Sequence, residues 1–211
     1  MSAESSLEPL LGLVSHEHGA DEQVDWADAE EALGVGLPSD YKAFMSVYGA
    51  GDIGDLGILG PLPVDYLQWD PGSIVDSVPP FRDLWDGEGG VPGIEADGSS
   101  VLPWGSGCNA NELGWLTLDP NPDRWPVVAW RRQIGYGDSH WKLFDCGMVD
   151  FLVRMMRAEF DECPLGDASL WGKTAPFVHW REAQRRWLAG LDPETGEPDP
   201  LGQEFLQWPA P

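Results

Sequence analysis

The chain has 211 residues, of which 42% are hydrophobic, and its 36 acidic and 12 basic side chains give a formal net charge of -24. This length and apolar content suffice for one generous domain, alone or with appendages. So negative a chain repels nucleic acid and anionic membranes and attracts basic proteins or cations, so we expect a soluble protein with a basic protein partner.

The acidity is uneven along the chain. The first 100 residues contain 20 of the 36 acidic residues but only two basic ones, Lys42 and Arg82. Such asymmetry hints at an interaction surface. A general compositional bias that keeps the protein soluble explains it equally well, so the charge distribution alone leaves both explanations open.

The sequence predicts a cytoplasmic protein. Cys108, Cys146 and Cys163 cannot all pair within one chain, and none belongs to a Cys-x-x-Cys motif, so we expect reduced thiols. The N-terminus lacks the basic region of a signal peptide, and no apolar run approaches the roughly 18 residues that a membrane span needs.

The N-terminal part predicts three helices. Ser5 or Ser6 can cap the first, which would end near Gly19, and Asp25 can cap the second, over residues 26–33.

The third helix follows Pro38, with Ser39 or Asp40 as its cap, and a left-handed Gly49 would stop it. Its apolar residues fall at positions i, i+3, i+4 and i+7, which is one helical face: Tyr41, Phe44, Met45 and Tyr48.

The middle of the chain predicts strands. Residues 53–59 form one strand, and residues 60–98 are so rich in proline and glycine that we expect a mostly irregular insertion with at most a short helix over 81–85. From residue 101 onward, the pattern predicts an antiparallel meander with strands at 101–104, 111–118, 125–130 and 141–144.

The C-terminal part predicts two more helices. Asp145 can cap one over residues 148–160, and another covers 177–191, followed by an extended or disordered tail. We therefore expect an α+β fold, in which N-terminal and C-terminal helices pack on a mainly antiparallel sheet. Residues 1–163 would form the domain, and residues 164–211 a helical extension and tail packed on it or wrapping it.

No arrangement of residues predicts a metal or cofactor site. The four histidines have no standard zinc-ligand spacing, and His16 and His18 are best explained as surface residues at a helix end. Ser106 and Cys108 lie in a glycine-rich turn without the Gly-x-Ser-x-Gly motif of hydrolases, so neither is a favoured nucleophile. The twelve tryptophans could stack on sugars, but their positions in predicted strands favour core packing.

Two short blocks of sequence resemble the SUKH superfamily, which includes the fungal cell-wall-synthesis regulator and many bacterial toxin-immunity proteins. The first block contains LPSDYK at 37–42 and YGAG at 48–51. The second contains LPWG at 102–105, Asn111, GWL at 114–116 and DRWPVV at 123–128, followed by a helix with Phe151 and Leu152. The long insertion at 60–98 and the residues after 164 depart from the simplest family pattern.

The resemblance implies an α+β fold, no cofactor and a role in binding another protein. Bacterial members are typically the immunity partner of a polymorphic toxin, often a nuclease. A nuclease needs a basic cleft for phosphates, which an acidic protein can occupy. Our leading hypothesis is an acidic surface that binds such a toxin, formed by Asp52, Asp55, Glu95, Asp97, Asp119 and Asp123.

Two other functions stay open. An intracellular regulatory or scaffold protein needs the same fold and surface, and only the gene neighbourhood would separate it from an immunity protein. A carboxylate-dependent hydrolase would need two acids that converge in a cleft with separated pKa values. Pairs drawn from the same six acidic residues could supply them, but surface turns explain these residues more simply.

Overall fold

The computed structural model describes residues 3–66, 70–107, 109–135, 137–166 and 169–199. Within these residues the fold is α+β, as predicted, with an eight-stranded sheet in the order β1-β8-β2-β3-β4-β5-β6-β7. Only β1 and β8 pair in parallel, and every other neighbouring pair is antiparallel. The strands are β1 (Val14–His18), β2 (Gly51–Ile53), β3 (Leu56–Ile58), β4 (Val101–Gly107), β5 (Glu112–Leu116), β6 (Val127–Trp130), β7 (Trp141–Phe144) and β8 (Ala175–His179).

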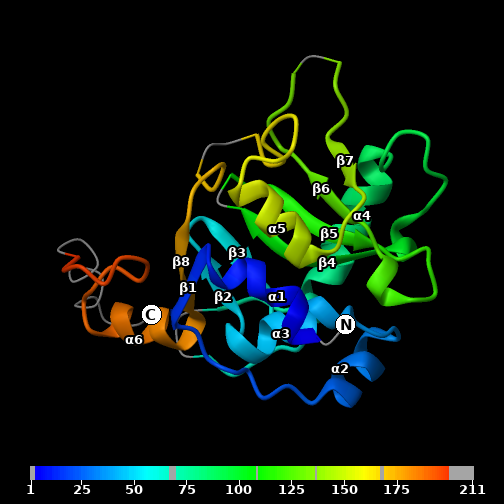
Figure 1. Cartoon of the computed structure of the whole chain (residues 1–211). Helices are drawn as coiled ribbons and strands as arrows, with labels where there is room; N and C mark the ends of the chain where they lie inside the picture. Colours follow the sequence, from blue (N-terminus) through cyan, green and yellow to red (C-terminus); the bar gives the residue numbers. More distant parts are fainter. Residues whose placement is uncertain (1–2, 67–69, 108, 136, 167–168, 200–211) are drawn as a thin grey trace, which may run out of the picture.

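Helices cover the sheet on both faces. Three of them, α1, α3 and α5, lie over one face (Figure 1), where they bury residues such as Leu10, Phe44 and Phe151 against the strands. On the other face, α4 packs Phe81 and Trp85 against Trp141 of β7. The α-helices are α1 (Ala3–Leu11), α2 (Trp26–Leu33), α3 (Ser39–Val47), α4 (Ile74–Glu88), α5 (Met148–Met156) and α6 (Trp180–Leu188).

The end of α2 was predicted correctly, but the caps of α3 and α5 were not. Asp25 accepts from the N–H of Ala27, and Gly34 closes α2 with φ 72°. At α3, neither Ser39 nor Asp40 is the N-cap; the N–H of Ser39 instead donates to Asp123 Oδ1 at 2.7 Å. Asp123 is 84 positions away from Ser39 in the sequence. A pattern of neighbouring residues cannot reveal such a partner.

The same arrangement recurs at α5. Its N-cap is Gly147, which has no side chain to offer, and not Asp145. Asp40 Oδ2 accepts from the N–H of Val149 at 3.0 Å. The helix ends at Met156, four residues earlier than expected, and Ala158 follows with φ 54°.

Two segments predicted as helix are strands. Residues 14–18 form β1 instead of continuing the first helix, so His16 and His18 lie on an edge strand and not at a helix end. Residues 177–179, predicted to begin the last helix, belong instead to β8, and that helix, α6, begins at Trp180 and ends at Leu188 instead of 191. In the described sheet β1 pairs only with β8, and β8 lies between β1 and β2. Pairing between distant segments therefore makes residues 14–18 and 175–179 strands and not helices.

The region from 53 to 98 is more regular than predicted. The single strand at 53–59 is a hairpin of β2 and β3, which turns at Gly54 with φ 53°. The insertion holds the 15-residue helix α4, capped by Ser73, which contains Pro79 and Pro80. These prolines remove two backbone donors, but burial of Phe81 and Trp85 compensates for that cost.

The YGAG segment at 48–51 joins the N-terminal helices to β8. A Cβ on Gly49, which has φ 73°, would lie 2.5 Å from Ala20 O and 2.5 Å from His179 Cδ2. His179 Nε2 donates to Glu22 at 2.8 Å, while its Nδ1 accepts from the N–H of Arg181 and so caps α6. Burial alone would raise the pKa of Glu22, but the hydrogen bonds from His179, Ala50 and Trp180 outweigh it and lower that pKa.

We predict that Gly49→Ala destabilises the protein by about 1–3 kcal/mol more than Gly34→Ala. Both glycines have a left-handed φ, so both variants bear the roughly 1–2 kcal/mol cost of that conformation. Only Gly49 also lacks room, because a Cβ on Gly34 would meet nothing within 4 Å; overpacking adds about 1–3 kcal/mol or more. Urea denaturation of the two variants measures the difference, and equal losses would contradict the steric explanation.

Candidate functional site

A row of four residues crosses the sheet on the face that carries α4. The strand register pairs Asp52 with Gly57, Gly57 with Ser106, and Ser106 with Glu112, from β2 to β5. Residues directly opposite each other on neighbouring strands project from the same face. The row therefore places two carboxylates, a hydroxyl and a glycine on one surface of the sheet.

This row forms the floor of two adjoining cavities. A cavity of about 510 Å³ is lined by Asp52, Asp55 and Glu194, together with Ala183 of α6. A second, of about 300 Å³, lies between α4 and the sheet and is lined by Glu112. Ser106 lines both cavities. We call the combined depression the acidic groove and define it by Asp52, Asp55, Gly57, Ser106, Glu112 and Glu194.

The wall that carries Glu194 is held in place by hydrogen bonds from Arg186 and to Asp192. The guanidinium of Arg186, which is 5% exposed, donates to the carbonyls of Pro193 and Glu194 at 3.1 and 2.7 Å. Asp192 Oδ1 accepts from the N–H groups of Glu194 and Thr195. These contacts fix the loop after α6, so the position of Glu194 beside the groove is built into the fold.

Gly57 leaves the floor of the groove open without being required by the backbone. Its φ is not in the left-handed region, and the nearest atom to an added Cβ would be Asp52 Oδ1 at 3.3 Å, on a side chain that can move. Gly114, by contrast, has Phe81 of α4 within 2.5 Å of the Cβ position. A glycine inside a strand often marks a place where another molecule approaches closely.

Both carboxylates of the row are costly to ionise. Burial raises the pKa of Asp52 to about 6, and the nearby charge of Glu194 adds to the effect. Burial also raises the pKa of Glu112 to about 7. Within the described residues, neither carboxylate has a hydrogen-bond or salt-bridge partner, and no lysine or arginine lines the groove. A cation from another molecule would supply the missing charge.

The geometry suits cation binding better than acid–base catalysis. Asp52 and Glu112 are separated by three strand spacings, so their Cα atoms lie about 14 Å apart. The two carboxyl groups of glycosidases are only roughly 5–10 Å apart. Ser106 has no histidine beside it among the residues that line the groove, so nothing there would activate its hydroxyl.

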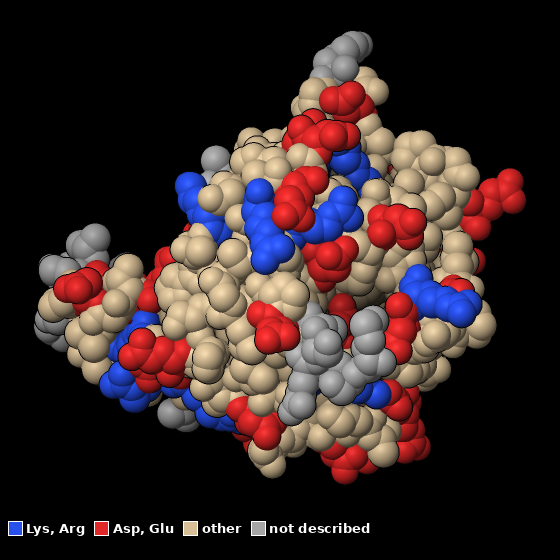
Figure 2. Space-filling model, viewed as in Figure 1, with Lys and Arg blue, Asp and Glu red and all other residues tan. Residues whose placement is uncertain are grey.

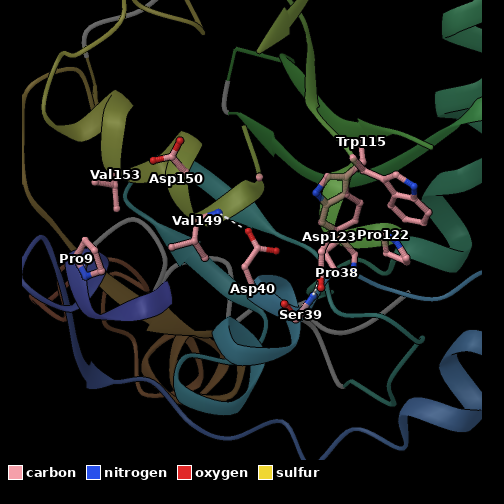
Figure 3. Close-up of a pocket in the computed structure, with 12 residues that line it drawn as sticks. Pro9, Pro38, Ser39, Asp40, Trp115, Pro122, Asp123, Val149, Asp150 and Val153 are labelled. Atoms are coloured by element: carbon pink, nitrogen blue, oxygen red, sulfur yellow. Dashed lines mark hydrogen bonds between the residues drawn. The ribbon is translucent and has the colours of Figure 1, made fainter. Parts of the chain in front are cut away.

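A separate cavity of about 230 Å³ lies where α3 and α5 begin, and its acids have structural partners. Figure 3 shows Asp40 turned toward the backbone of Val149 and Asp123 toward that of Ser39. Burial raises the pKa of Asp40, and the charge of Asp123 adds to it, whereas the Val149 N–H opposes it. These carboxylates stabilise helix N-termini.

The six acids predicted to bind a partner do not line one common cavity among those described. Asp52 and Asp55 line the acidic groove, whereas Asp123 lines the cavity at α3 and α5. Asp119 accepts from the N–H of Asn121 and lies 3.8 Å from Arg124.

The remaining two, Glu95 and Asp97, precede the short 3₁₀ helix η1 (Gly98–Ser100). Hydrogen bonds from Ser99 lower the pKa of Asp97.

Sequence reasoning missed Glu112 and Glu194 and undervalued Ser106. Glu112 alternates with Gly114 and Leu116 on one side of β5, a signal that could have placed it on the α4 face. Glu194 reaches the groove only because of the loop after α6. Cys108 lies outside the described residues. In the described part of the chain, no three His, Cys, Asp or Glu side chains are placed to hold a metal, and no helix is both long and apolar enough to cross a membrane.

We predict that Asp52→Asn and Glu112→Gln each stabilise the protein by about 1 kcal/mol at pH 8. The folded-state pKa of each group lies above its unfolded value, so ionisation opposes folding and stability falls as pH rises from about 4 to about 7.

The gain from either substitution should disappear below pH 4, where the wild-type groups are protonated in both states. Denaturant melts across this pH range measure it. Asp55→Asn, at an exposed turn, serves as the control and should change stability little. An equal gain in stability at all pH values would contradict the raised pKa values of Asp52 and Glu112.

Comparison with known proteins identifies the family. The chain matches the model of the SMI1-KNR4 cell-wall family, SUKH_6, over residues 23–143. A comparison with curated proteins found no match. The matched region runs from just before α2 into β7, and it contains the Asp52 to Glu112 row but neither β8 nor α6. Because the match covers more than half of the chain, the protein belongs to the SUKH family.

Proposed function

We propose that this protein is a non-enzymatic, cytoplasmic immunity protein that neutralises a cognate basic toxin, in the simplest case a nuclease domain, by binding it through an acidic surface. Membership of the SUKH family supports a protein-binding role. The observation that carries the proposal is a groove with two carboxylates that no described lysine or arginine neutralises, in a chain of net charge -24.

The physical chemistry of nucleases supports this choice of partner. A nuclease holds phosphates with lysine and arginine, and the same residues attract an acidic protein. Complementary charge also speeds association and excludes wrongly charged partners. Much of the acidity is distributed: Figure 2 shows acidic and basic side chains interspersed over the face with α1, α3 and α5. The net charge therefore speeds the approach of a basic partner, and the local arrangement of acidic side chains must determine which partner binds.

The description of the matching family model refers to the cell wall, which favours a second candidate, a regulatory or scaffold protein of the same fold. Both functions require a protein partner, so the gene neighbourhood separates them. A gene for a secreted protein with a variable toxin domain next to this one favours immunity. The third candidate, a carboxylate-dependent hydrolase, gains no support from acidic residues whose Cα atoms lie about 14 Å apart along the sheet.

We predict that co-expression of this chain restores growth to cells that express the basic toxin domain encoded beside it. The purified pair should bind tightly, and raising the salt concentration from 50 to 500 mM should weaken binding by about 100-fold, because screening removes the electrostatic attraction. Growth assays and calorimetry measure the two effects. Hen lysozyme, a basic protein of unrelated shape, is the control and should bind far more weakly. Failure of every neighbouring toxin domain to bind or to be neutralised would contradict the proposal.

A further inference from the structure

We propose that the acidic groove receives an extended segment of the partner that crosses the strands and carries two lysine or arginine side chains about four residues apart. This inference rests on the proposed function for the identity of the partner protein, but the groove and its ligand chemistry are argued from the structure. It narrows the predicted surface of six scattered acids to one site.

Within the described residues, the Asp52 end of the groove is a part of the sheet that no helix covers, and the Glu112 end lies beside α4. On this face, α4 lies against β4 to β7, where Phe81 approaches Gly114 and packs on Trp141. Ala183 of α6 and Val178 of β8 bound the groove at the other side. Between them, Asp52, Gly57 and Ser106 line or underlie open cavities of about 510 and 300 Å³. A segment of another chain therefore has both a floor and two walls.

The negative charge of the groove favours a partner segment with basic side chains. Two other acids that the fold partly shields from solvent are each paired with a basic side chain: Glu22 with Arg181 at 3.1 Å, and Glu182 with Arg186 at 2.8 Å. The acids of the groove have no such cation among the residues that line it. The carboxylates of Asp52 and Glu194 repel each other, and a cation bound between them would reduce this repulsion. A lysine or arginine side chain meets this requirement, and arginine can bridge two carboxylates.

The distance between the acids of the row determines how far apart the two basic side chains of the bound segment must lie. Asp52 and Glu112 lie three strand spacings apart, about 14 Å along the row. In an extended segment, side chains at i and i+4 point the same way and are separated by about 13 Å. One such segment can therefore place one cation at Asp52 and Glu194 and the other at Glu112. Its backbone would pass over Gly57, where no side chain blocks it.

Three variants test the site. Gly57→Val fills the floor without changing charge, and a β-branched residue suits a strand. Asp52→Asn combined with Glu112→Gln removes both charges of the row and is expected to stabilise the fold, so loss of binding cannot be ascribed to unfolding. Glu17→Gln combined with Glu31→Gln is the matched control, because it removes two exposed charges elsewhere. Thermal melts establish that each variant is folded.

The probe is a seven-residue peptide with arginine at its second and sixth positions and threonine or serine elsewhere. An isomer with two adjacent arginines has the same charge and is the control peptide. Titration at 150 mM salt, followed by ¹H–¹⁵N NMR, should show the first peptide binding the wild-type protein more tightly and shifting the amides of Gly57 and Ser106. Gly57→Val and the Asp52/Glu112 variant should each weaken it by about tenfold. The Glu17/Glu31 variant should change affinity by less than twofold.

Equal binding of the two peptides, or equal losses in the groove and control variants, would overturn the inference, because nonspecific attraction to net charge would then explain binding. The same variants are also tested with the basic toxin domain. If the toxin binds the groove variants as it binds the wild type, the groove is not its site, although the immunity proposal stands. If the spaced peptide binds the groove but no toxin domain binds the protein, the immunity proposal fails and the groove remains.

Discussion

The fold depends on the close approach of the YGAG segment to β8. Gly49 and Gly51 have no room for a side chain, because the backbone of Ala20 and Val178 and the ring of His179 occupy the space. His179 uses both ring nitrogens there, one toward Glu22 and one toward the N–H of Arg181. One contact thus fixes the exit of α3, the start of α6 and the insertion of β8 beside β2. The walls of the acidic groove follow from it, because α6 and the loop with Glu194 are placed by β8.

The groove combines features that oppose stability. Asp52 and Glu112 are partly buried without partners, and ionising them at neutral pH disfavours the folded state. Asp40 and Asp123, which line the separate cavity at α3 and α5, differ from them in having partners, since each accepts a hydrogen bond from a backbone N–H at the N-terminus of a helix. Protein sites that bind charged ligands commonly retain such unfavourable groups. This contrast separates the acids that hold helix N-termini from Asp52 and Glu112, which have no hydrogen-bond or salt-bridge partner within the described residues.

The regular, local parts of the fold could be predicted. Asp25 and Gly34 delimit α2, the meander from β4 to β7 follows its β-forming residues, and buried Trp104, Trp115 and Trp141 confirm the core role of these tryptophans. Segments whose structure depends on distant partners were predicted wrongly. Residues 14–18 and 175–179 are strands because they pair with each other, and α4 accommodates two prolines because it buries an aromatic face on the sheet.

The sequence by itself determined the α+β class, the family, the excess of negative charge and Asp52 as a candidate. These properties are carried by composition and by short blocks of neighbouring residues, which act locally. The tertiary structure alone decided which acids act together. Register across four strands aligned Asp52 with Glu112, the loop after α6 brought Glu194 beside Asp52, and the N-termini of α3 and α5 engaged Asp123 and Asp40. The physical reason is that burial and charge–charge distance set the chemistry of a carboxylate, and both are properties of the packed chain.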